Sequence, residues 1–399
     1  MATKFATVAL GAALVASATA CSSGGARNDG DIALMVIADL TAPGFSFPQI
    51  VDGAQAAVNE VNRAGGIDGR TIALLTCDSQ NDPNAAAACA RKAVAEEVSA
   101  VVGMQSLQSD AIVRGLEAAN IPAVGGNDIG ALDRKSPISF PLTSTPSVLF
   151  AVAAAMPGYE QCTKPGVFSS DVPITAEYAE IITDFFAENV PTASPVRTVS
   201  STVTATDVTA QVATLLEGGT DCVFMLNPPA LNLAAVKAIY NSGAKVKVSG
   251  ATPALPPQSM ADLGEAAIGV YSTSGFKLPG TAAAADVYSE GMNEVNPEAI
   301  QDTNSEGAYA GVKIVAQAMT GLEDQSPKAV LNALNSMKNI DVGVVAPIPG
   351  FPADSGLAGI PRTFNTFAYS YQWDGQQYVM TRPEPIDVKP QLAESLDNR

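Results

Sequence analysis

The sequence contains no histidine among its 399 residues. Histidine is the usual general base near neutral pH, the activator of serine and cysteine nucleophiles, and the commonest zinc ligand. The sequence also contains no G-x-x-x-x-G-K-[ST] motif, and no G-x-G-x-x-G motif follows a predicted strand. Because these signatures are missing, we expect neither an enzyme nor a bound cofactor or metal.

Basic residues are also scarce, with 22 Lys and Arg against 40 Asp and Glu and a net charge of −18. Nucleic acids and anionic membrane surfaces bind basic patches, so this balance argues against both as partners. Beyond the N-terminal leader, no run of 18 or more apolar residues occurs. A hydrophobic content of 47% predicts a globular protein with a sizeable core, and the length predicts two domains.

The N-terminus has the composition of a signal peptide. Lys4 is the only charged residue before Cys21, and residues 8–18 are small and apolar but too few to remain across a bilayer. The residues before Cys21 resemble a lipobox, although Ala18 stands where leucine is usual. We predict a signal peptide over residues 1–20, a lipid anchor on Cys21 at the extracytoplasmic side of the cell membrane, and a flexible tether over residues 21–30. Ordinary cleavage without lipid and a buried N-terminal helix are the alternatives.

From Asp31 onward, predicted strands alternate with predicted helices, which indicates an α/β fold with doubly wound parallel sheets. A second unit of similar size starts after Pro146, and residues 282–340 are helical again. The last part of the chain alternates aromatic and polar residues around Asp374 and Gly375, which predicts a hairpin. In the first unit the predicted strands cover 31–40, 71–78, 99–103 and 121–126, and the predicted helices cover 48–64, 83–98 and 108–119. In the second unit the predicted strands cover 166–171, 196–201, 221–226, 245–250 and 267–272.

Residues 53–103 combine several motifs in a fixed order. A predicted helix ends in N-x-x-G-G-I-x-G, a strand leads to D-S-x-x-D-P, and an Ala-rich helix leads to a strand ending in V-x-G. Together these motifs resemble the N-terminal segment of type I periplasmic binding proteins, in the leucine/isoleucine/valine-binding branch of ABC-transporter solute receptors. A looser similarity extends to about residue 385, through the helix expected at 306–319.

The resemblance implies a monomeric receptor with two α/β lobes, which closes on a small molecule and hands it to an ABC permease. It places three chain crossings near Pro146, Lys277 and Asp341. The first lobe would comprise residues 31–145 and 278–340, and the second lobe residues 146–277 and 341–399. Two other functions stay open: an exported sensor for a membrane signalling protein, and an extracytoplasmic hydrolase that uses paired carboxylates such as Asp78 and Asp82.

The predicted strands end in loops rich in Gly, Pro, Ser and Asn, and ligands of open parallel sheets bind beyond such strand ends. The resemblance assigns ligand contacts on these loops to Ser46 or Phe47, Ser106, Leu107, Gly126, Asn127, Asp171, Asn227, Pro228 and Thr252. Thr252 stands where amino-acid-binding members carry an acidic residue, and Pro228 replaces an aromatic one. We therefore expect a small polar metabolite that is amino-acid-like or carboxylate-bearing.

A structural role is the alternative for several of these residues. Ser106, Ser109 and Asn127 have side chains that commonly cap helices. Asp171 could either supply the missing carboxylate or cap a helix.

The five cysteines are an odd number, and lipid on Cys21 would leave four for two disulfides. Cys77 ends a strand, and Cys89 lies about two turns into the next helix. Cys162 lies just before the first strand of the second unit and Cys222 at the start of a later one, and parallel neighbours bring their beginnings to one sheet edge. We predict the pairs Cys77–Cys89 and Cys162–Cys222, because mixed pairs would link the two lobes and restrain closure. Four buried thiols are the alternative.

Overall fold

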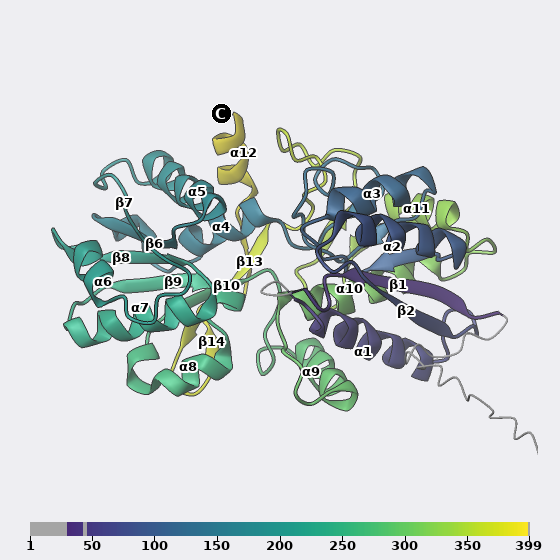
Figure 1. Cartoon of the computed structure of the whole chain (residues 1–399), viewed down its shortest axis with the longest axis horizontal. Coiled ribbons are helices and arrows are strands. Elements are labelled where there is room, and N and C mark those ends of the chain that lie inside the picture. Colours follow the sequence, from purple (N-terminus) through teal and green to yellow (C-terminus); the bar gives the residue numbers. More distant parts are fainter. Residues whose placement is uncertain (1–29, 43–45, 398–399) are drawn as a thin grey trace, which may run out of the picture.

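The chain folds into two α/β lobes that lie side by side (Figure 1). The structure, a computed structural model, describes residues 30–42 and 46–397. Each lobe has its own sheet with helices packed around it. This is the α/β architecture that the alternation of strands and helices predicts.

The first sheet consists of parallel strands in the order β2-β1-β3-β4-β5. All seven residues of β1 are buried, because the sheet is covered on both faces, and this explains the continuous apolar run in the sequence. The strands are β1 (Ile32–Ala38), β2 (Ile72–Asp78), β3 (Ala100–Val102), β4 (Ala123–Val124) and β5 (Ser139–Phe140).

Six helices surround this sheet within the described residues, and three begin with side-chain caps, among them Ser326, which accepts a hydrogen bond from the amide of Ala329. The Asp82 side chain accepts hydrogen bonds from the backbone amides of Asn84 and Ala85, and Pro83 occupies the first turn of α2. Asp302 and Ser305 form a capping box at the start of α10. The helices are α1 (Gln49–Arg63), α2 (Pro83–Ala95), α3 (Ser109–Ala118), α9 (Ala283–Val295), α10 (Thr303–Met319) and α11 (Pro327–Ser336).

Helix α10 approaches the first sheet very closely although it lies far along the chain. A Cβ atom on Gly311 would lie 2.7 Å from the carbonyl oxygen of Val124, so only glycine fits there without a shift. On its other side, α10 is tied to α1, because Tyr309 and Lys313 both donate hydrogen bonds to the carboxylate of Glu60. These contacts hold α10 in the first lobe.

The second sheet has the order β14-β13-β10-β9-β8-β6-β7, and β15 pairs with β13. Strands β6 to β10 are parallel, whereas β13 runs antiparallel to β10, β14 and β15. The predicted hairpin around Asp374 and Gly375 is confirmed as the β13–β14 turn. The strands are β6 (Pro165–Ser170), β7 (Arg197–Ser201), β8 (Cys222–Leu226), β9 (Lys247–Ala251), β10 (Tyr271–Ser274), β13 (Phe367–Trp373), β14 (Tyr378–Met380) and β15 (Ile386–Asp387).

The helices of the second lobe complete its core. Aromatic rings of Phe150, Phe185, Phe186 and Phe224 pack edge-on or tilted against one another beneath the sheet. The helices are α4 (Thr145–Ala154), α5 (Pro173–Asn189), α6 (Thr209–Leu216), α7 (Pro229–Ser242), α8 (Pro257–Leu263) and α12 (Lys389–Asp397), with short 3₁₀ turns η1 (Tyr159–Gln161), η2 (Thr252–Ala254) and η3 (Gly264–Ala267).

The chain passes between the lobes three times in the described residues. The first and third passages lead from the first lobe to the second: Leu142 of the first core is followed by Leu149 of the second lobe, and Phe364 is followed by Ala368. The second passage leads back to the first lobe: Val270 packs in the second lobe, and Phe276 packs in the first core. The first two passages lie near the predicted Pro146 and Lys277.

The third passage lies later than the predicted position near Asp341. Most apolar side chains between Val342 and Phe364 pack in the first core, whereas Ala346, Leu357 and Ile360 pack in the second lobe, and β11 (Lys338–Ile340) pairs with β12 (Ile348–Gly350). Arg362 anchors this segment. Its buried guanidinium lies between the rings of Phe140 and Phe364 and donates hydrogen bonds to the carbonyl oxygens of Ser139 in β5 and of Pro137 just before it. Residues 341–364 therefore contact both lobes, mainly the first, and the division of the chain into lobes stays a prediction.

Both predicted disulfides are present. Cys77 pairs with Cys89 at a Cα–Cα distance of 5.6 Å, and Cys162 pairs with Cys222 at 5.8 Å. Each bridge stays within one lobe, so neither restrains a movement of one lobe against the other.

The predicted leader and anchor lie outside the described residues. This applies to the signal peptide at 1–20, to Cys21, and to the tether up to residue 29. Within residues 30–42 and 46–397, no helix has the length and apolar character needed to cross a membrane.

Candidate functional site

A pocket of about 800 Å³ lies between the two lobes. It lies beyond the carboxyl ends of β3 and β4 in the first lobe and of β6, β8, β9 and β10 in the second, where open parallel sheets bind ligands. All three chain crossings also contribute, through Thr143, Gly275 and Phe367. Because both lobes share the pocket, a movement of one lobe against the other changes its volume.

The surface of the pocket is mainly apolar, with uncharged polar groups interspersed. Among the described residues, none of those lining it is Asp or Glu, and Arg134 is the only basic one. A pocket of this size and character is typical of a site for a small organic molecule. Its larger apolar side chains are Leu107, Ile129, Leu142, Val148, Leu149, Val152, Val172, Val203, Met225, Leu226, Pro228, Pro253 and Phe367.

Four of the predicted ligand contacts line this pocket: Leu107, Asn127, Asn227 and Pro228. The amide nitrogen of Asn127 donates a 2.8 Å hydrogen bond to the side-chain oxygen of Asn304 at the start of α10. The amide nitrogen of Asn227 donates to the carbonyl oxygen of Phe168 at 2.8 Å. These bonds fix both side chains in the pocket wall, and their contact with a ligand stays a prediction.

Ser106 and Gly126 do not line the pocket. Ser106 is completely buried, and its hydroxyl donates to Asp39. The backbone N–H of Leu107 also donates to the Asp39 carboxylate, at 3.2 Å. A Cβ on Gly126 would lie 2.4 Å from the carbonyl oxygen of Met104, so this glycine permits close backbone packing. The prediction that the Ser106 hydroxyl and its neighbouring N–H hold a ligand therefore conflicts with the structure.

The other predicted contacts lie outside the pocket as well. Ser46 is exposed and donates to the carbonyl oxygen of Leu40, and Phe47 packs against the first core. Asp171 is exposed. Thr252 is buried and donates to the carbonyl oxygen of Thr273, and its neighbours Ala251 and Pro253 reach the pocket instead.

Sequence reasoning missed two residues with strong hydrogen-bonding groups, Arg134 and Tyr178. Arg134 lies in the irregular loop between β4 and β5, and Tyr178 lies on α5 of the second lobe. Neither belongs to a motif of the chain. The feature of the sequence that could have indicated Arg134 is that a basic residue, rare in this chain, lies close to the end of a predicted strand.

Three buried polar atoms of the pocket wall have no hydrogen-bond partner among the described residues. They are Oγ of Ser147, Oδ1 of Asn227 and Oγ1 of Thr273, all contributed by the second lobe. Each of these side chains is less than one-tenth exposed. Because a buried polar atom without a partner is unfavourable, these atoms indicate where a ligand or water would form hydrogen bonds.

Two buried carboxyl groups lie behind the first-lobe wall. Burial raises the pKa of Asp128, and the nearby Arg134 guanidinium and the hydrogen bond from the Thr145 amide oppose this shift. Burial raises the pKa of Asp133 to about 7, although hydrogen bonds from Ser109 and Gly130 oppose it. Neither carboxyl lines the pocket.

The carboxylates considered for a hydrolase have structural hydrogen bonds and lie away from the pocket. Asp82 caps α2. Asp78 accepts hydrogen bonds from the amides of Leu40 and Gln80 and from the Thr41 hydroxyl. Burial raises the pKa of Asp78, but these hydrogen bonds outweigh it and hold the pKa below its usual value. The pair therefore has the role of turn and helix caps.

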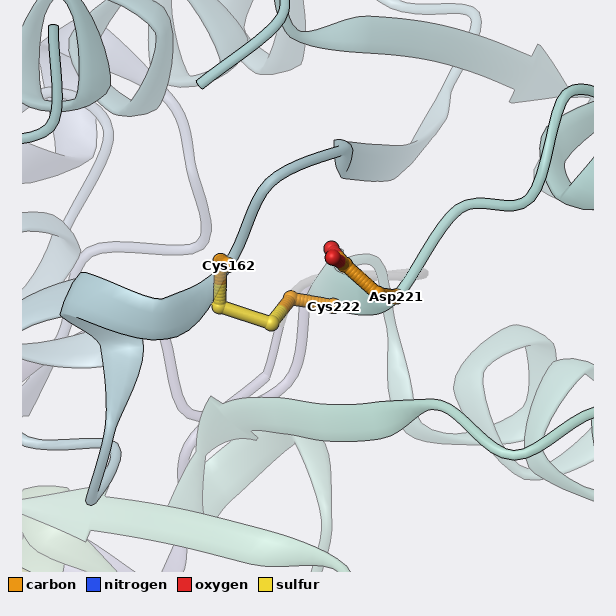
Figure 2. Close-up of side chains that lie close together, drawn as sticks. All are labelled: Cys162, Asp221 and Cys222. Carbon is orange, nitrogen blue, oxygen red and sulfur yellow. A yellow bond between two sulfur atoms is a disulfide. The ribbon is translucent and has the colours of Figure 1, made fainter. Parts of the chain in front are cut away.

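Cys162, Cys222 and Asp221 lie close together in the second lobe (Figure 2). Both sulfur atoms belong to the disulfide, so neither is a thiolate that could ligate a metal. The Asp221 carboxylate accepts hydrogen bonds from the amides of Thr163 and Lys164, at 2.8 and 2.9 Å. The disulfide and these hydrogen bonds therefore hold residues 162–164 against the start of β8.

Comparisons with known proteins agree with this architecture. The chain is 38% identical over 74 residues to the Leu/Ile/Val-binding protein BraC3 of Rhizobium johnstonii, a match that covers 18% of this chain and 20% of that protein. The chain thus matches only about a fifth of the length of this curated relative.

Two solved structures share the fold over nearly the whole chain. A fatty acid ABC transporter substrate-binding protein from Thermomonospora curvata superposes with a TM-score of 0.69 at 20% identity, covering 94% of this chain and 96% of that chain. An ABC-transporter solute-binding protein from R. palustris, in complex with 4-hydroxybenzoate, gives a TM-score of 0.69 at 18% identity, covering 90% and 97%. At these identities the similarity establishes the fold.

The family itself is established by sequence. The family model described as "Periplasmic binding protein" matches residues 32–366, which include most of both lobes and the first two crossings. The motifs at 53–103 indicate the same family, and the two-lobed sheet topology is that of its type I members. The chain therefore belongs to the periplasmic binding protein family, with the type I fold.

Proposed function

We propose that this protein is an exported solute receptor that closes its two lobes on a small molecule and delivers it to an ABC permease. The observation that carries the proposal is the pocket of about 800 Å³, whose wall is shared by the two lobes and the three crossings. The two disulfides stabilise each lobe separately and leave the crossings free to bend. Such an arrangement suits hinge closure around a ligand.

The proposed ligand is a small amino-acid-like or carboxylate-bearing molecule. The similar structures include a fatty acid transport receptor and a receptor in complex with 4-hydroxybenzoate. Both molecules combine a carboxylate with an apolar body. The mainly apolar pocket with one arginine has room for such a ligand.

Small-angle scattering tests closure. The protein is unfolded and refolded to remove any bound molecule, incubated with a metabolite extract, and separated from unbound material. Mass spectrometry then identifies the retained molecule, and the radius of gyration is measured with and without it. We expect a smaller radius in the bound form. A retained ligand with an unchanged radius, or no retained molecule at all, would contradict the proposal.

Delivery to a permease is tested separately from binding. Uptake of the identified ligand into vesicles that contain the permease encoded nearest to this gene should require this protein. If the protein binds and closes but supports no uptake, the exported sensor becomes the better interpretation.

We further propose that the mature protein begins at Cys21, carries lipid there, and is monomeric. The four other cysteines are paired, so Cys21 is not needed for either bridge. Mass spectrometry of the N-terminal peptide from membranes should show a lipid-modified Cys21, and the Cys21→Ser variant should leave the membrane fraction. Sedimentation of the variant should give the mass of one chain.

A further inference from the structure

We propose, building on the receptor function above, that Arg134 and Tyr178 together hold the carboxylate of a ligand that has an apolar body and no ammonium group. The two residues come from opposite lobes. A carboxylate that bridges them therefore couples ligand binding to closure.

The guanidinium of Arg134 has N–H groups that can donate hydrogen bonds to a ligand. Its Nε donates to the carbonyl oxygen of Asp128 at 3.0 Å and lies 3.6 Å from the Asp128 carboxylate, and Nη2 makes a long contact of 3.5 Å to the carbonyl oxygen of Ile129. No residue in the described part of the chain accepts a hydrogen bond from Nη1. The side chain is 30% exposed and lines the pocket. A planar guanidinium with free N–H groups binds carboxylates strongly.

The backbone around Arg134 is held in place independently of its side chain. Its carbonyl oxygen accepts a hydrogen bond from the amide of Arg362, the residue that anchors the segment before the third crossing. The loop is also fixed by Asp133, which accepts hydrogen bonds from Ser109 and Gly130. The guanidinium is thus presented from a fixed loop, which lowers the entropy cost of binding.

Tyr178 provides the second donor, from the other lobe. It lies on α5 and lines the same pocket, and its hydroxyl has no hydrogen-bond partner among the described residues. Burial raises the pKa of Tyr178, the charge of Arg134 opposes this rise, and the charges of Asp128 and Glu177 add to it. The neutral phenol is a donor to a carboxylate oxygen.

The rest of the pocket favours an apolar body and disfavours an ammonium group. No Asp or Glu of the described chain lines the pocket, so a bound ammonium would lose its hydration without gaining an opposite charge. The unpaired atoms of Ser147, Asn227 and Thr273 can bond a hydroxyl or water, but they carry no charge. An α-amino acid should therefore bind more weakly than the same acid without its amino group.

Titration calorimetry on the wild-type protein, stripped of bound molecules by refolding, tests the ligand class. Two matched series serve as probes: octanoate, octanamide and 2-aminooctanoate, and 3-phenylpropanoate, 3-phenylpropanamide and phenylalanine. We expect at least one carboxylate to bind about 10- to 100-fold more tightly than its amide and its amino acid, because the amide lacks the charge-assisted hydrogen bonds. An amino acid that binds as tightly as its deaminated partner, or a series in which no carboxylate binds, would overturn the inference.

Substitutions test the two residues. Arg134→Gln should weaken carboxylate binding about 10- to 100-fold and leave amide binding nearly unchanged. Arg134→Lys should lose less carboxylate affinity than Arg134→Gln does, because lysine keeps the positive charge. Tyr178→Phe should weaken binding about 5- to 10-fold. Arg114→Gln on exposed α3 and Tyr240→Phe on exposed α7 are the matched controls, and both should bind as the wild type does. Thermal unfolding of each variant shows that it is folded.

The outcomes separate this inference from the proposed function. If the Arg134→Gln variant binds the carboxylate as tightly as the wild-type protein does, Arg134 does not hold the ligand. If the lobes close on a ligand from the metabolite extract that has no carboxylate, the receptor function stands and the ligand class is wrong. If neither the probes nor the extract yields a bound molecule, the receptor function itself fails.

Discussion

The hydroxyl of Ser106 donates a 2.9 Å hydrogen bond to Oδ1 of Asp39, and both side chains are completely buried. The same carboxylate accepts hydrogen bonds from the Ser79 hydroxyl and from the amides of Asn81 and Leu107. Asp39 thus ties the ends of β1, β2 and β3 together beneath the pocket. The donors of Ser106 and Leu107, which were predicted to contact a ligand, are thus turned inward.

Ser106→Ala should therefore reduce stability and leave ligand affinity nearly unchanged. Removing the hydroxyl deprives Asp39 of one donor, which should lower the free energy of unfolding by about 1–2 kcal/mol. Urea unfolding measures this loss, and calorimetry with the ligand measures affinity. Asn127→Ala, which alters the pocket wall itself, is the comparison and should weaken binding. A tenfold loss of affinity in Ser106→Ala at unchanged stability would show that the serine reaches the ligand after all.

The two disulfides should contribute unequally to stability. They close chain segments with sequence separations of 12 and 60 residues. Because a longer closed segment removes more entropy from the unfolded chain, we expect losses of about 3 kcal/mol for the Cys77→Ser/Cys89→Ser variant and about 4 kcal/mol for the Cys162→Ser/Cys222→Ser variant. Denaturant unfolding of each double variant shows which one loses more stability. Since each bridge lies within one lobe, ligand affinity should stay the same in both.

Asp133 should make the protein less stable as the pH rises toward neutrality. Burial raises its pKa from 3.8 to about 7, so the folded protein retains a proton that the unfolded chain has lost. The Asp133 carboxyl therefore contributes fully to the free energy of unfolding below about pH 4. This contribution is lost as the pH rises to about 7, at up to about 1.4 kcal/mol per pH unit.

The Asp133→Asn variant should show a smaller fall in unfolding free energy between pH 4 and pH 7 than the wild type does. Its amide oxygen can still accept the hydrogen bonds from Ser109 and Gly130, but the group cannot ionise. Asp262→Asn, an exposed carboxylate on α8, is the control. If the free energy of unfolding falls equally between pH 4 and pH 7 in Asp133→Asn and in the wild type, the prediction is wrong.

Gly311→Ala should destabilise the protein although alanine favours helices. Alanine gains about 1 kcal/mol over glycine in a helix interior. Here its Cβ would lie 2.7 Å from the carbonyl oxygen of Val124 and 3.1 Å from the Cα of Gly125, and backbone atoms cannot move aside cheaply. Overpacking of this kind costs about 1–3 kcal/mol, so we expect a net loss of up to about 2 kcal/mol.

The matched control for Gly311→Ala is Gly291→Ala on α9. There the nearest atom to the new Cβ is the Ala56 side chain, at 3.3 Å. Urea unfolding should show a near-neutral effect for Gly291→Ala. If the two variants are equally stable, the close approach of α10 to the first sheet is not a constraint on the fold.

The pattern of strands and helices in both lobes followed from the sequence alone, because each strand is a short apolar run and most helices have an apolar face. β1 and α1 lie within two residues of their predicted ends. The disulfide pairs were also predictable, because each pair lies at matching positions of adjacent elements. Helix α4 was not predicted, because it is buried on nearly all sides and its sequence shows no alternation of apolar and polar residues.

The ligand-facing side chains were decided by the tertiary structure. The sequence alone located the loops at the strand ends, and Asn127 and Asn227 do line the pocket, but it could not show that Asp39 turns the donors of Ser106 inward. It also gave no sign that Arg134, in a loop without periodicity, reaches the same pocket as Tyr178 of the other lobe. Local patterns follow from backbone geometry and burial, whereas a binding site depends on contacts between segments that are far apart in the chain.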